Sequence, residues 1–205
     1  MTNISSSDMK QLIEVCHSLH ARGMVSGSGG NVSIRVGDKI LITPTGVSLS
    51  AISEENLVVM NMDGTWEGEI RPSKEYVLHQ SCYQNRPDVK AVVHVHSLHA
   101  VALSCLIEPG DEIPIYFSGY AMRVGRLPML PYMKPGAKEL ASGVAEVIKE
   151  RNSVLLANHG VVCVGADIQE AVNIAEEIEE NAHLYFVLQG GGHPLQGKDL
   201  AAFSL

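Results

Sequence analysis

The sequence lacks the features that mark secreted and membrane proteins. Its first residues, MTNISSSDMKQ, are polar and predict no signal peptide. No uninterrupted apolar run reaches the length of a membrane span. The few cysteines have no close paired spacing and lie within apolar patterns, which is typical of reduced core thiols in a cytoplasmic protein and not of a disulfide framework. They are Cys16, Cys82, Cys105 and Cys163.

The chain also lacks an excess of positive charge. Its formal net charge is -8, so no basic surface for nucleic acid or anionic membranes is expected, and an anionic substrate must be held by local groups. Hydrophobic residues make up 45% and charged residues 19%, a balance that excludes a disordered chain. With 205 residues, a single domain spanning residues 1–205 is expected.

Hydrophobic periodicity predicts an α/β protein. It has more predicted strands than a simple alternation of strands and helices in βαβ units would contain. Hairpins are frequent, so a mixed or antiparallel central sheet with helices on its faces is expected. Ser7 is the predicted cap of the first helix. Residues 117–136 contain three prolines and three glycines, so they are predicted to be mostly loop with one short strand around Leu127–Leu130. Predicted strands include Ala91–His96, Ile113–Tyr116 and Ser153–Ala157, and predicted helices include Ser73–Asn85 and the last one, Ile168–Leu188.

One stretch, RPSKEYVLHQSCYQNRPDVKAVVHVH (residues 71–96), combines a predicted helix with a predicted buried strand. Residues two apart in a strand share a face, so His94 and His96 present two imidazoles side by side. Taken alone this pair is weak evidence, because a buried His bonded to a carbonyl is commoner than a ligand. Burying two adjacent imidazoles unpaired costs free energy, however, and a metal such as zinc removes that cost.

Two more residues extend this candidate metal site. His159 follows the apolar strand at a glycine break, and strand ends often carry chemistry in α/β proteins. Glu75 lies in the first turn of the predicted helix, where simple helix capping is the competing interpretation. His79, four residues on, is interpreted as an orienting or core residue, and Glu179 with His183 as a solvated helical pair.

Three turns are candidates for a phosphate site. The loop Gly27–Asn31, the pair Thr45-Gly46 and the helix start at Ser73-Lys74 all offer backbone N–H groups and small side chains. The competing interpretation is three ordinary turns, since neither a Walker motif nor a dinucleotide fingerprint is present.

The motifs form a recognisable set. In chain order they are GN-x-S, TPTG, PS-x-E-x-x-x-H, AVVH-x-H and LL-x-x-HG. This set resembles the class II aldolase/adducin-type family, whose enzymes include fuculose-phosphate aldolase and ribulose-phosphate epimerase. The resemblance implies a three-layer αβα sandwich with a central, mostly antiparallel sheet, a homotetramer, and a divalent metal, with Zn²⁺ expected and Mn²⁺ or Co²⁺ as alternatives. It implies the metal ligands Glu75, His94, His96 and His159, with Glu75 also catalytic, and the phosphate-binding positions Asn31, Thr45, Gly46, Ser73 and Lys74.

The stretches PSKE, YAMRVGRLPMLPYMKPG, LLANHGVV and AEEIEENAHLYF are most similar to the 3-oxo-tetronate 4-phosphate decarboxylases of this family. This implies a carbon–carbon lyase acting on a small phosphorylated sugar acid. Loss of CO₂ leaves an enediolate whose charge the metal stabilises, and protonation at C2 by Glu75 gives dihydroxyacetone phosphate. The alternatives are an aldehyde-lyase of the fuculose-phosphate type or an epimerase at the same site and, last, a non-catalytic adducin-like interaction domain. Lys74 or Arg123 is expected to orient the substrate carboxylate or to add charge to the phosphate site.

Overall fold

The protein is built on one seven-stranded sheet, described here from a computed structural model that covers residues 4–203. The strand order is β3-β2-β1-β4-β7-β6-β5, and every neighbouring pair is antiparallel except β5 with β6. The expectation of a mostly antiparallel central sheet is therefore confirmed. The strands are β1 (Asn31–Val36), β2 (Lys39–Ile42), β3 (Val58–Asn61), β4 (Ala91–Val95), β5 (Met129–Leu130), β6 (Ser153–Leu156) and β7 (Gly160–Gly165).

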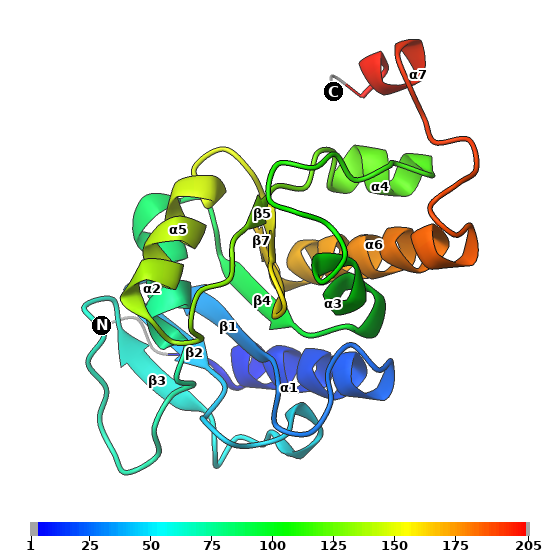
Figure 1. The fold of residues 1–205 in the computed structure, drawn as a ribbon. Helices are drawn as coiled ribbons and strands as arrows, with labels where there is room; N and C mark the ends of the chain where they lie inside the picture. The colour runs from blue at the N-terminus through cyan, green and yellow to red at the C-terminus, as the bar shows by residue number, and fades with distance from the viewer. Residues whose placement is uncertain (1–3, 204–205) are drawn as a thin grey trace.

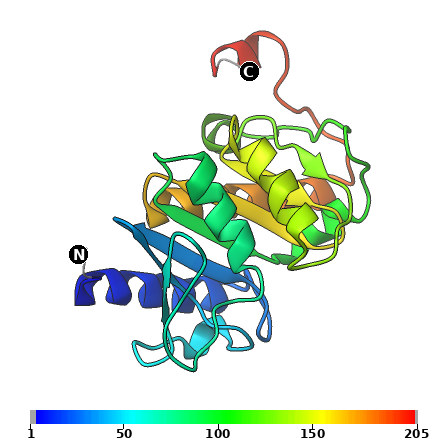
Figure 2. The same ribbon diagram turned by 90° about the vertical axis from the view of Figure 1, so that its left-hand side faces the viewer.

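Helices cover both faces of the sheet and complete a three-layer αβα sandwich (Figure 1). Helices α2 and α5 pack side by side on one face, as Figure 2 shows. The opposite face is covered by α1, α3, α4 and α6, and each face has its own apolar core. The helices are α1 (Ser6–Ala21), η1 (Leu49–Ala51, a 3₁₀ turn), α2 (Tyr76–Asn85), α3 (Leu98–Ser104), α4 (Ser118–Arg123), α5 (Lys138–Ile148), α6 (Ile168–Val187) and α7 (Lys198–Ala201).

Strand β4 lies at the centre of the sheet and is buried throughout. Successive side chains of a strand point to opposite faces, so Val93 packs in the core beneath α6 while His94 points to the face covered by α2 and α5. Asn31 of β1 is the register partner of His94 and shares that face. The central strand thus carries a polar pair into the layer between the sheet and α2.

Several predicted boundaries differ from the structure near the functional motifs. Helix α2 begins at Tyr76 and not at Ser73, so Glu75 is its N-cap residue. Strand β4 ends at Val95, which leaves His96 one residue beyond it. The first helix is capped by Ser5 instead of Ser7, because Ser5 forms a reciprocal capping box with Asp8.

Other predictions about the second half of the chain were wrong. Residues 113–116 form no strand, and the predicted loop that follows contains α4, whose Tyr120 and Ala121 are buried. Tertiary packing of this short segment on α6 overrides its high glycine content. The predicted last helix is followed by α7, and Cys105 is exposed, unlike the other three thiols. Within residues 4–203, no helix has both the length and the apolar character needed to cross a membrane.

Candidate metal centre

Four side chains converge where β4, the β6–β7 turn and the start of α2 meet. The Nε2 atom of His94 lies 3.0 Å from Nε2 of His96 and 3.2 Å from Nε2 of His159. The carboxylate of Glu75 lies 3.2 Å from His94 Nε2 through Oε2, and 3.6 Å from His159 Nε2 through Oε1. One ligand atom from each residue lies within 4.8 Å of all the others. The structure thus brings together the four residues expected to bind metal.

The carboxylate of Glu75 is directed at the imidazoles and not at its own helix. It occupies the N-cap position of α2 but makes no capping hydrogen bond. The simple capping interpretation of Glu75 is therefore wrong. Its neighbour Asn31 donates a hydrogen bond from Nδ2 to Oε2 at 3.1 Å, whereas Oε1 is buried without a hydrogen-bond partner among the described residues. A buried, unpaired carboxylate oxygen is costly unless a cation or a substrate engages it.

Backbone contacts fix the orientation of the His94 ring. Its Nδ1 lies 3.0 Å from the carbonyl oxygen of Val161, which can only accept, so Nδ1 carries the proton. The lone pair of Nε2 then faces the other three groups. A hydrogen bond from the second ring nitrogen to a carbonyl is the usual way in which proteins orient a metal-binding His.

Glycines allow the chain to pack tightly around His96. A Cβ atom at Gly29 would lie 2.9 Å from His96 Nδ1, and one at Gly160 would lie 2.8 Å from His96 Cδ2 and 2.4 Å from the Val95 carbonyl oxygen. Neither position has room for a side chain. The glycines in the sequence motifs GSGGN and HG are therefore required for close packing against this imidazole as well as for turn formation.

His159 is placed by a strained turn that α3 supports. The preceding residue, Asn158, has a positive φ of 53°, a conformation that Asn tolerates better than most residues. Its backbone N–H donates to the hydroxyl of Ser104 at 3.1 Å, and its side-chain amide lies 3.1 Å from the sulfur of Cys105. The end of α3 thus holds the turn that presents His159 to the cluster.

The electrostatics of the cluster favour metal binding. Burial lowers the pKa of His96 to about 3 and that of His159 to about 4, with His94 adding to both shifts, so these two rings are neutral. Burial alone would lower the pKa of His94, but the Glu75 carboxylate outweighs it and the pKa is raised. Burial alone would raise the pKa of Glu75, but His94, His159 and Asn31 outweigh it and hold the pKa below its usual range. An ionised Glu75 and neutral His96 and His159 are the forms that bind a metal, and a metal at Nε2 of His94 replaces any proton there.

The spacing also fits a divalent cation. A tetrahedral ion with ligand distances of about 2.0–2.2 Å separates its ligand atoms by roughly 3.3–3.6 Å. Four of the ligand-atom separations among Glu75, His94, His96 and His159, at 3.0 to 3.6 Å, are close to this range, and all lie within 4.8 Å. The three imidazole nitrogens and the Glu75 carboxylate, whose Oε1 atom has no hydrogen-bond partner among the described residues, form a donor set suited to a first-row metal.

Two of the three turns expected to bind phosphate, those at Thr45-Gly46 and Ser73-Lys74, belong to segments joined by backbone contacts. Pro44 and Pro72 form an isolated antiparallel bridge, the N–H of Thr45 donates to the Arg71 carbonyl, and the N–H of Ser73 donates to the Thr43 carbonyl. The antiparallel bridge thus places Thr45 opposite Arg71 and Thr43 opposite Ser73. Ser73 is buried and Lys74 is exposed. Asn31 is hydrogen-bonded to Glu75, which directly follows Lys74.

Arg123, the other cation considered for the substrate, lies elsewhere in the same chain. It is on α4, which packs on α6 across the sheet from α2, and its guanidinium pairs with Glu177 at 2.7 Å. Lys74 directly precedes Glu75 and has no such partner among the described residues. Of the two, Lys74 is the cation next to the metal cluster.

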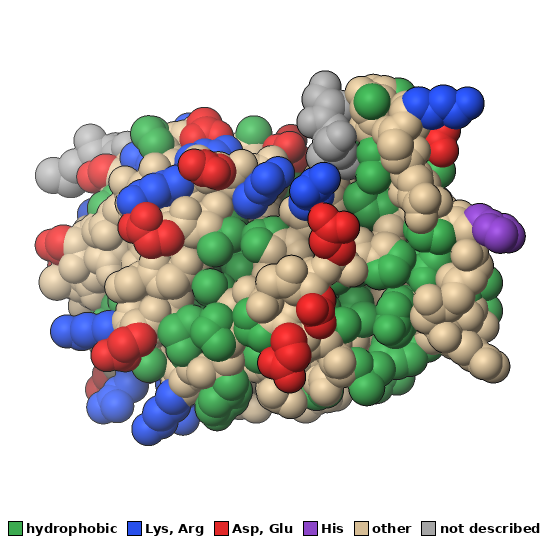
Figure 3. Space-filling model, turned by 45° about the horizontal axis from the view of Figure 1, so that its top comes forward, with side chains coloured by type: hydrophobic (Ala, Val, Ile, Leu, Met, Phe, Trp, Pro, Cys, Tyr) green, Lys and Arg blue, Asp and Glu red, His purple; other side chains and the backbone are tan. Residues whose placement is uncertain are grey.

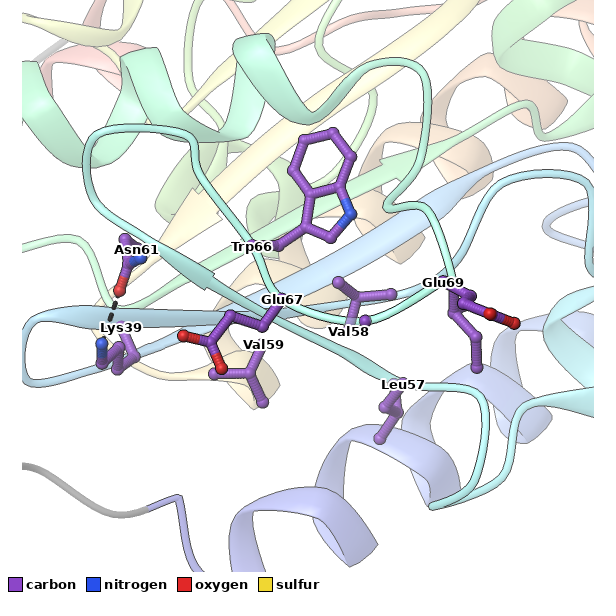
Figure 4. A pocket seen from close by; sticks show the side chains of 10 residues that line it. Lys39, Leu57, Val58, Val59, Asn61, Trp66, Glu67 and Glu69 are labelled. Carbon is purple, nitrogen blue, oxygen red and sulfur yellow. Dashed lines mark hydrogen bonds between the residues drawn. The ribbon is translucent and has the colours of Figure 1, made fainter.

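A hollow beside the edge strand β3 is not part of this site. Figure 4 shows it lined by Trp66, Glu67 and Glu69 from the loop after β3, with Lys39 bound to Asn61. Its two carboxylates repel a phosphorylated ligand. None of the four clustered residues lines it.

Sequence reasoning missed a residue that supports the strand end. Glu179 of α6 is not a solvated partner of His183: its carboxylate accepts hydrogen bonds from the N–H groups of His99 and Ala100, at 3.1 and 2.9 Å, and lies 2.7 Å from the His99 ring. It therefore caps α3 directly after His96. No local pattern reveals this contact, because the two partners are far apart in the sequence.

Comparisons with known proteins agree with the fold and the cluster. Residues 10–186 match the family model "Class II Aldolase and Adducin N-terminal domain". A 3-oxo-tetronate 4-phosphate decarboxylase from Haemophilus influenzae is 40% identical over 193 residues, 93% of this chain and 91% of the relative. An L-fuculose phosphate aldolase from Escherichia coli O6:H1 is 37% identical, covering 86% of this chain and 81% of the relative. The crystal structure of YgbL from Klebsiella pneumoniae superposes with a TM-score of 0.91 at 34% identity, covering 98% of this chain and 100% of that one.

The chain therefore belongs to the class II aldolase and adducin family. Class II aldolases use a divalent metal, and this member has a site of one glutamate and three histidines in which to hold it.

Proposed function

We propose that this protein is a carbon–carbon lyase that decarboxylates a 3-oxo-tetronate 4-phosphate to dihydroxyacetone phosphate and CO₂. The observation that carries the proposal is the complete Glu75, His94, His96 and His159 cluster in a chain 40% identical to a decarboxylase of that specificity. The expected alternative, aldol cleavage of a ketose phosphate, is supported by the relative at 37% identity. A non-catalytic, adducin-like role is disfavoured because all four clustered positions carry metal-binding side chains.

The proposed roles follow from where each residue lies. When bound, a divalent metal would supply a Lewis acid that stabilises negative charge on the substrate. Breaking the C1–C2 bond releases CO₂ and leaves its electron pair delocalised between C2 and the C3 oxygen. Loss of CO₂ from a carboxylate releases no proton, so the proton that C2 then requires comes from solvent. Glu75, which is ionised in the resting site, is proposed to take up that proton and pass it to C2, because Oε1 is buried, has no hydrogen-bond partner among the described residues and lies within the cluster.

We propose that the phosphate is held by Thr45, Gly46, Ser73 and Lys74. The proposal is supported by the bridge between Pro44 and Pro72, which joins the turn that contains Thr45 and Gly46 to the segment that leads into Ser73, Lys74 and Glu75. The contribution of Asn31 is proposed to be indirect, because its amide is hydrogen-bonded to Glu75 and to His79. Replacing Lys74 by Ala is expected to raise KM for the phosphorylated substrate, with Arg123→Ala as the matched loss of a cation outside the site. An unchanged kcat/KM in Lys74→Ala would remove Lys74 from the site.

We further propose Zn²⁺ as the native metal, with Mn²⁺ and Co²⁺ as alternatives, since imidazole-rich donor sets suit all three. Residues 1–205 are proposed to form one domain, supported by the single continuous sheet. A cytoplasmic location is proposed from the four free thiols.

A homotetramer is proposed from the family and from exposed apolar side chains. On the face of the molecule drawn in Figure 3, apolar side chains gather on the half that bears the C-terminal segment. The large exposed apolar side chains are Val59, Ile70, Leu98, Leu106, Met122, Tyr132, Val187 and Leu188. Sedimentation of the purified protein tests this proposal, and a monomer at working concentration would refute it.

Product analysis tests the main proposal. The metal-loaded protein is incubated with a 3-oxo-tetronate 4-phosphate and, separately, with a panel of ketose phosphates. CO₂ and dihydroxyacetone phosphate from the first, without aldehyde from the panel, are the expected results. Aldehyde release from a ketose phosphate without decarboxylation would favour the aldolase instead. Failure to bind any divalent metal would favour the interaction domain.

A further inference from the structure

A continuous row of buried side chains lies behind Glu75, between the sheet and α2. Asn31 donates to Glu75 Oε2 at 3.1 Å, and Nε2 of His79 lies 2.5 Å from Asn31 Oδ1. Nδ1 of His79 lies 2.7 Å from the hydroxyl of Ser33, which lies 2.8 Å from the hydroxyl of Tyr83. His79 and Ser33 are completely buried and Tyr83 nearly so. Side chains from β1 and α2 alternate along the row.

The direction of each hydrogen bond follows from the carboxylate at one end. A carboxylate that binds a metal only accepts hydrogen bonds, so the Asn31 amide must turn its nitrogen toward Glu75 and its oxygen toward His79. That oxygen also only accepts. The hydrogen between Asn31 and His79 therefore resides on Nε2 of the imidazole.

The far half of the row has the same direction. Burial holds the His79 imidazole neutral, so Nδ1 carries no hydrogen and accepts the hydroxyl hydrogen of Ser33. That hydroxyl has only one hydrogen, so it does not donate to Tyr83. The single hydroxyl hydrogen of Tyr83 faces the Ser33 carbonyl oxygen, to which it donates at 3.0 Å, and the Ser33 hydroxyl oxygen at 2.8 Å. The hydrogens of Ser33, His79 and Asn31 in the row thus point toward Glu75.

We propose that His79 is a positioning residue for Glu75, acting through the amide of Asn31. Asn31 is itself anchored by its place in β1, opposite His94 of β4, so only its amide is free to rotate. Without the donor at Nε2, the amide can rotate and face Glu75 with its oxygen, which repels the carboxylate. The proposal deepens the function proposed above, since it rests on Glu75 being the metal ligand and proton carrier.

The tautomer of His79 can be measured without any substrate. Long-range ¹H–¹⁵N correlation spectra of the protein, with and without Zn²⁺, are expected to show a neutral His79 with its hydrogen on Nε2. The signal should be protected from exchange because the ring is fully buried. A hydrogen on Nδ1 would reverse the row and overturn the proposal, whatever the reaction of the enzyme.

Two substitutions of His79 separate positioning from packing. His79→Leu fills the space without a donor and is expected to weaken zinc affinity about 10- to 100-fold and to lower kcat similarly, with little change in KM. His79→Gln restores an amide donor and is expected to recover most of both losses. The control Cys82→Ala alters the buried apolar side of the same helix and is expected to leave both values unchanged. Equal losses in His79→Leu and His79→Gln, or none in a folded His79→Leu, would overturn the proposal.

Ser33→Ala tests the direction of the row at a distance from the cluster. Removing the donor to Nδ1 allows the His79 hydrogen to move to that nitrogen, so a shift of the tautomer toward Nδ1–H and a smaller loss of zinc affinity are expected. An unchanged tautomer in a folded Ser33→Ala protein would contradict the assigned direction. Zinc affinity is measured by competition with a chromophoric chelator. The tautomer of His79 and the zinc affinity are both measured without substrate, so both test the proposal even if the reaction proves to be aldol cleavage instead of decarboxylation.

Discussion

Adding a single methyl group at Gly160 tests how closely the metal cluster depends on backbone packing. A Cβ atom there would lie 2.4 Å from the Val95 carbonyl oxygen and 2.8 Å from Cδ2 of His96. Real Cβ contacts hardly ever fall under 3.0 Å, so the backbones of β4 and β7 would have to separate by at least 0.6 Å. Both strands are fully buried in the centre of the sheet, which leaves them little room to move.

The separation has two expected consequences. Overpacking a buried position costs about 1–3 kcal/mol of unfolding free energy. Moving His96 by several tenths of an ångström also spoils the ligand geometry, and a misplacement of about 1 Å can cost roughly 100-fold in rate. We therefore expect Gly160→Ala to lower the free energy of unfolding by about 1–3 kcal/mol and zinc affinity by about 10-fold or more.

Urea unfolding of the metal-free protein and chelator competition measure the two effects separately. Gly143→Ala is the matched control, because its new methyl group would meet only flexible side-chain ends of Met133 and Leu130, at 3.2 and 3.3 Å. As a replacement within helix α5 it is expected to be neutral or to stabilise by up to about 1 kcal/mol. Wild-type stability and zinc affinity in Gly160→Ala would show that the close packing around His96 is not required.

Three further predictions concern the cluster and its support. Removing the metal with a chelator is expected to lower Tm by about 5–10 °C relative to the protein at a zinc concentration about 100 times Kd, and zinc should restore it in a calorimetric scan. Zinc affinity is expected to fall as pH falls, because zinc competes with a proton for Nε2 of His94; burial alone would lower the pKa of His94, but the Glu75 carboxylate outweighs it and raises the pKa. Chelator competition at several pH values measures this effect, and an affinity that does not change with pH would contradict it. Glu179→Gln is expected to destabilise the protein by about 1–2 kcal/mol at neutral pH. Burial alone would raise the pKa of Glu179, but its hydrogen bonds outweigh burial and lower the pKa. The stabilisation by the Glu179 carboxylate is therefore present above the usual glutamate pKa and is lost as pH falls through the lowered value. Urea unfolding of wild type and Glu179→Gln at several pH values measures it, and a difference in unfolding free energy that stays constant with pH would contradict this origin.

Much of the site could be predicted because its residues lie in strongly patterned segments. The apolar run around His94 predicts a buried strand, and the break at His159 predicts a strand end. The role of Glu75 could not be decided this way, since a carboxylate at a helix start has an ordinary capping function. The structure decides against capping because the side chain faces the imidazoles.

Other features depend on contacts that no local pattern records. Helix α4 forms in a segment rich in glycine because Tyr120 and Ala121 are buried against α6. Glu179 caps α3 from a position 80 residues away. Likewise, the hydrogen bond that joins Asn31 to His79 spans 48 residues and requires β1 and α2 to pack together first.

The sequence by itself determined the elements and the chemical kind of the site, because periodicity and ligand-type residues are local properties of the chain. It identified the strand that carries His94, the following His96, the turn at His159 and the family that these motifs resemble. Only the tertiary structure decided which groups meet at atomic distance and which way each points. Orientation depends on the packing of distant segments, and this packing turns Glu75 toward the imidazoles and places His79 behind it.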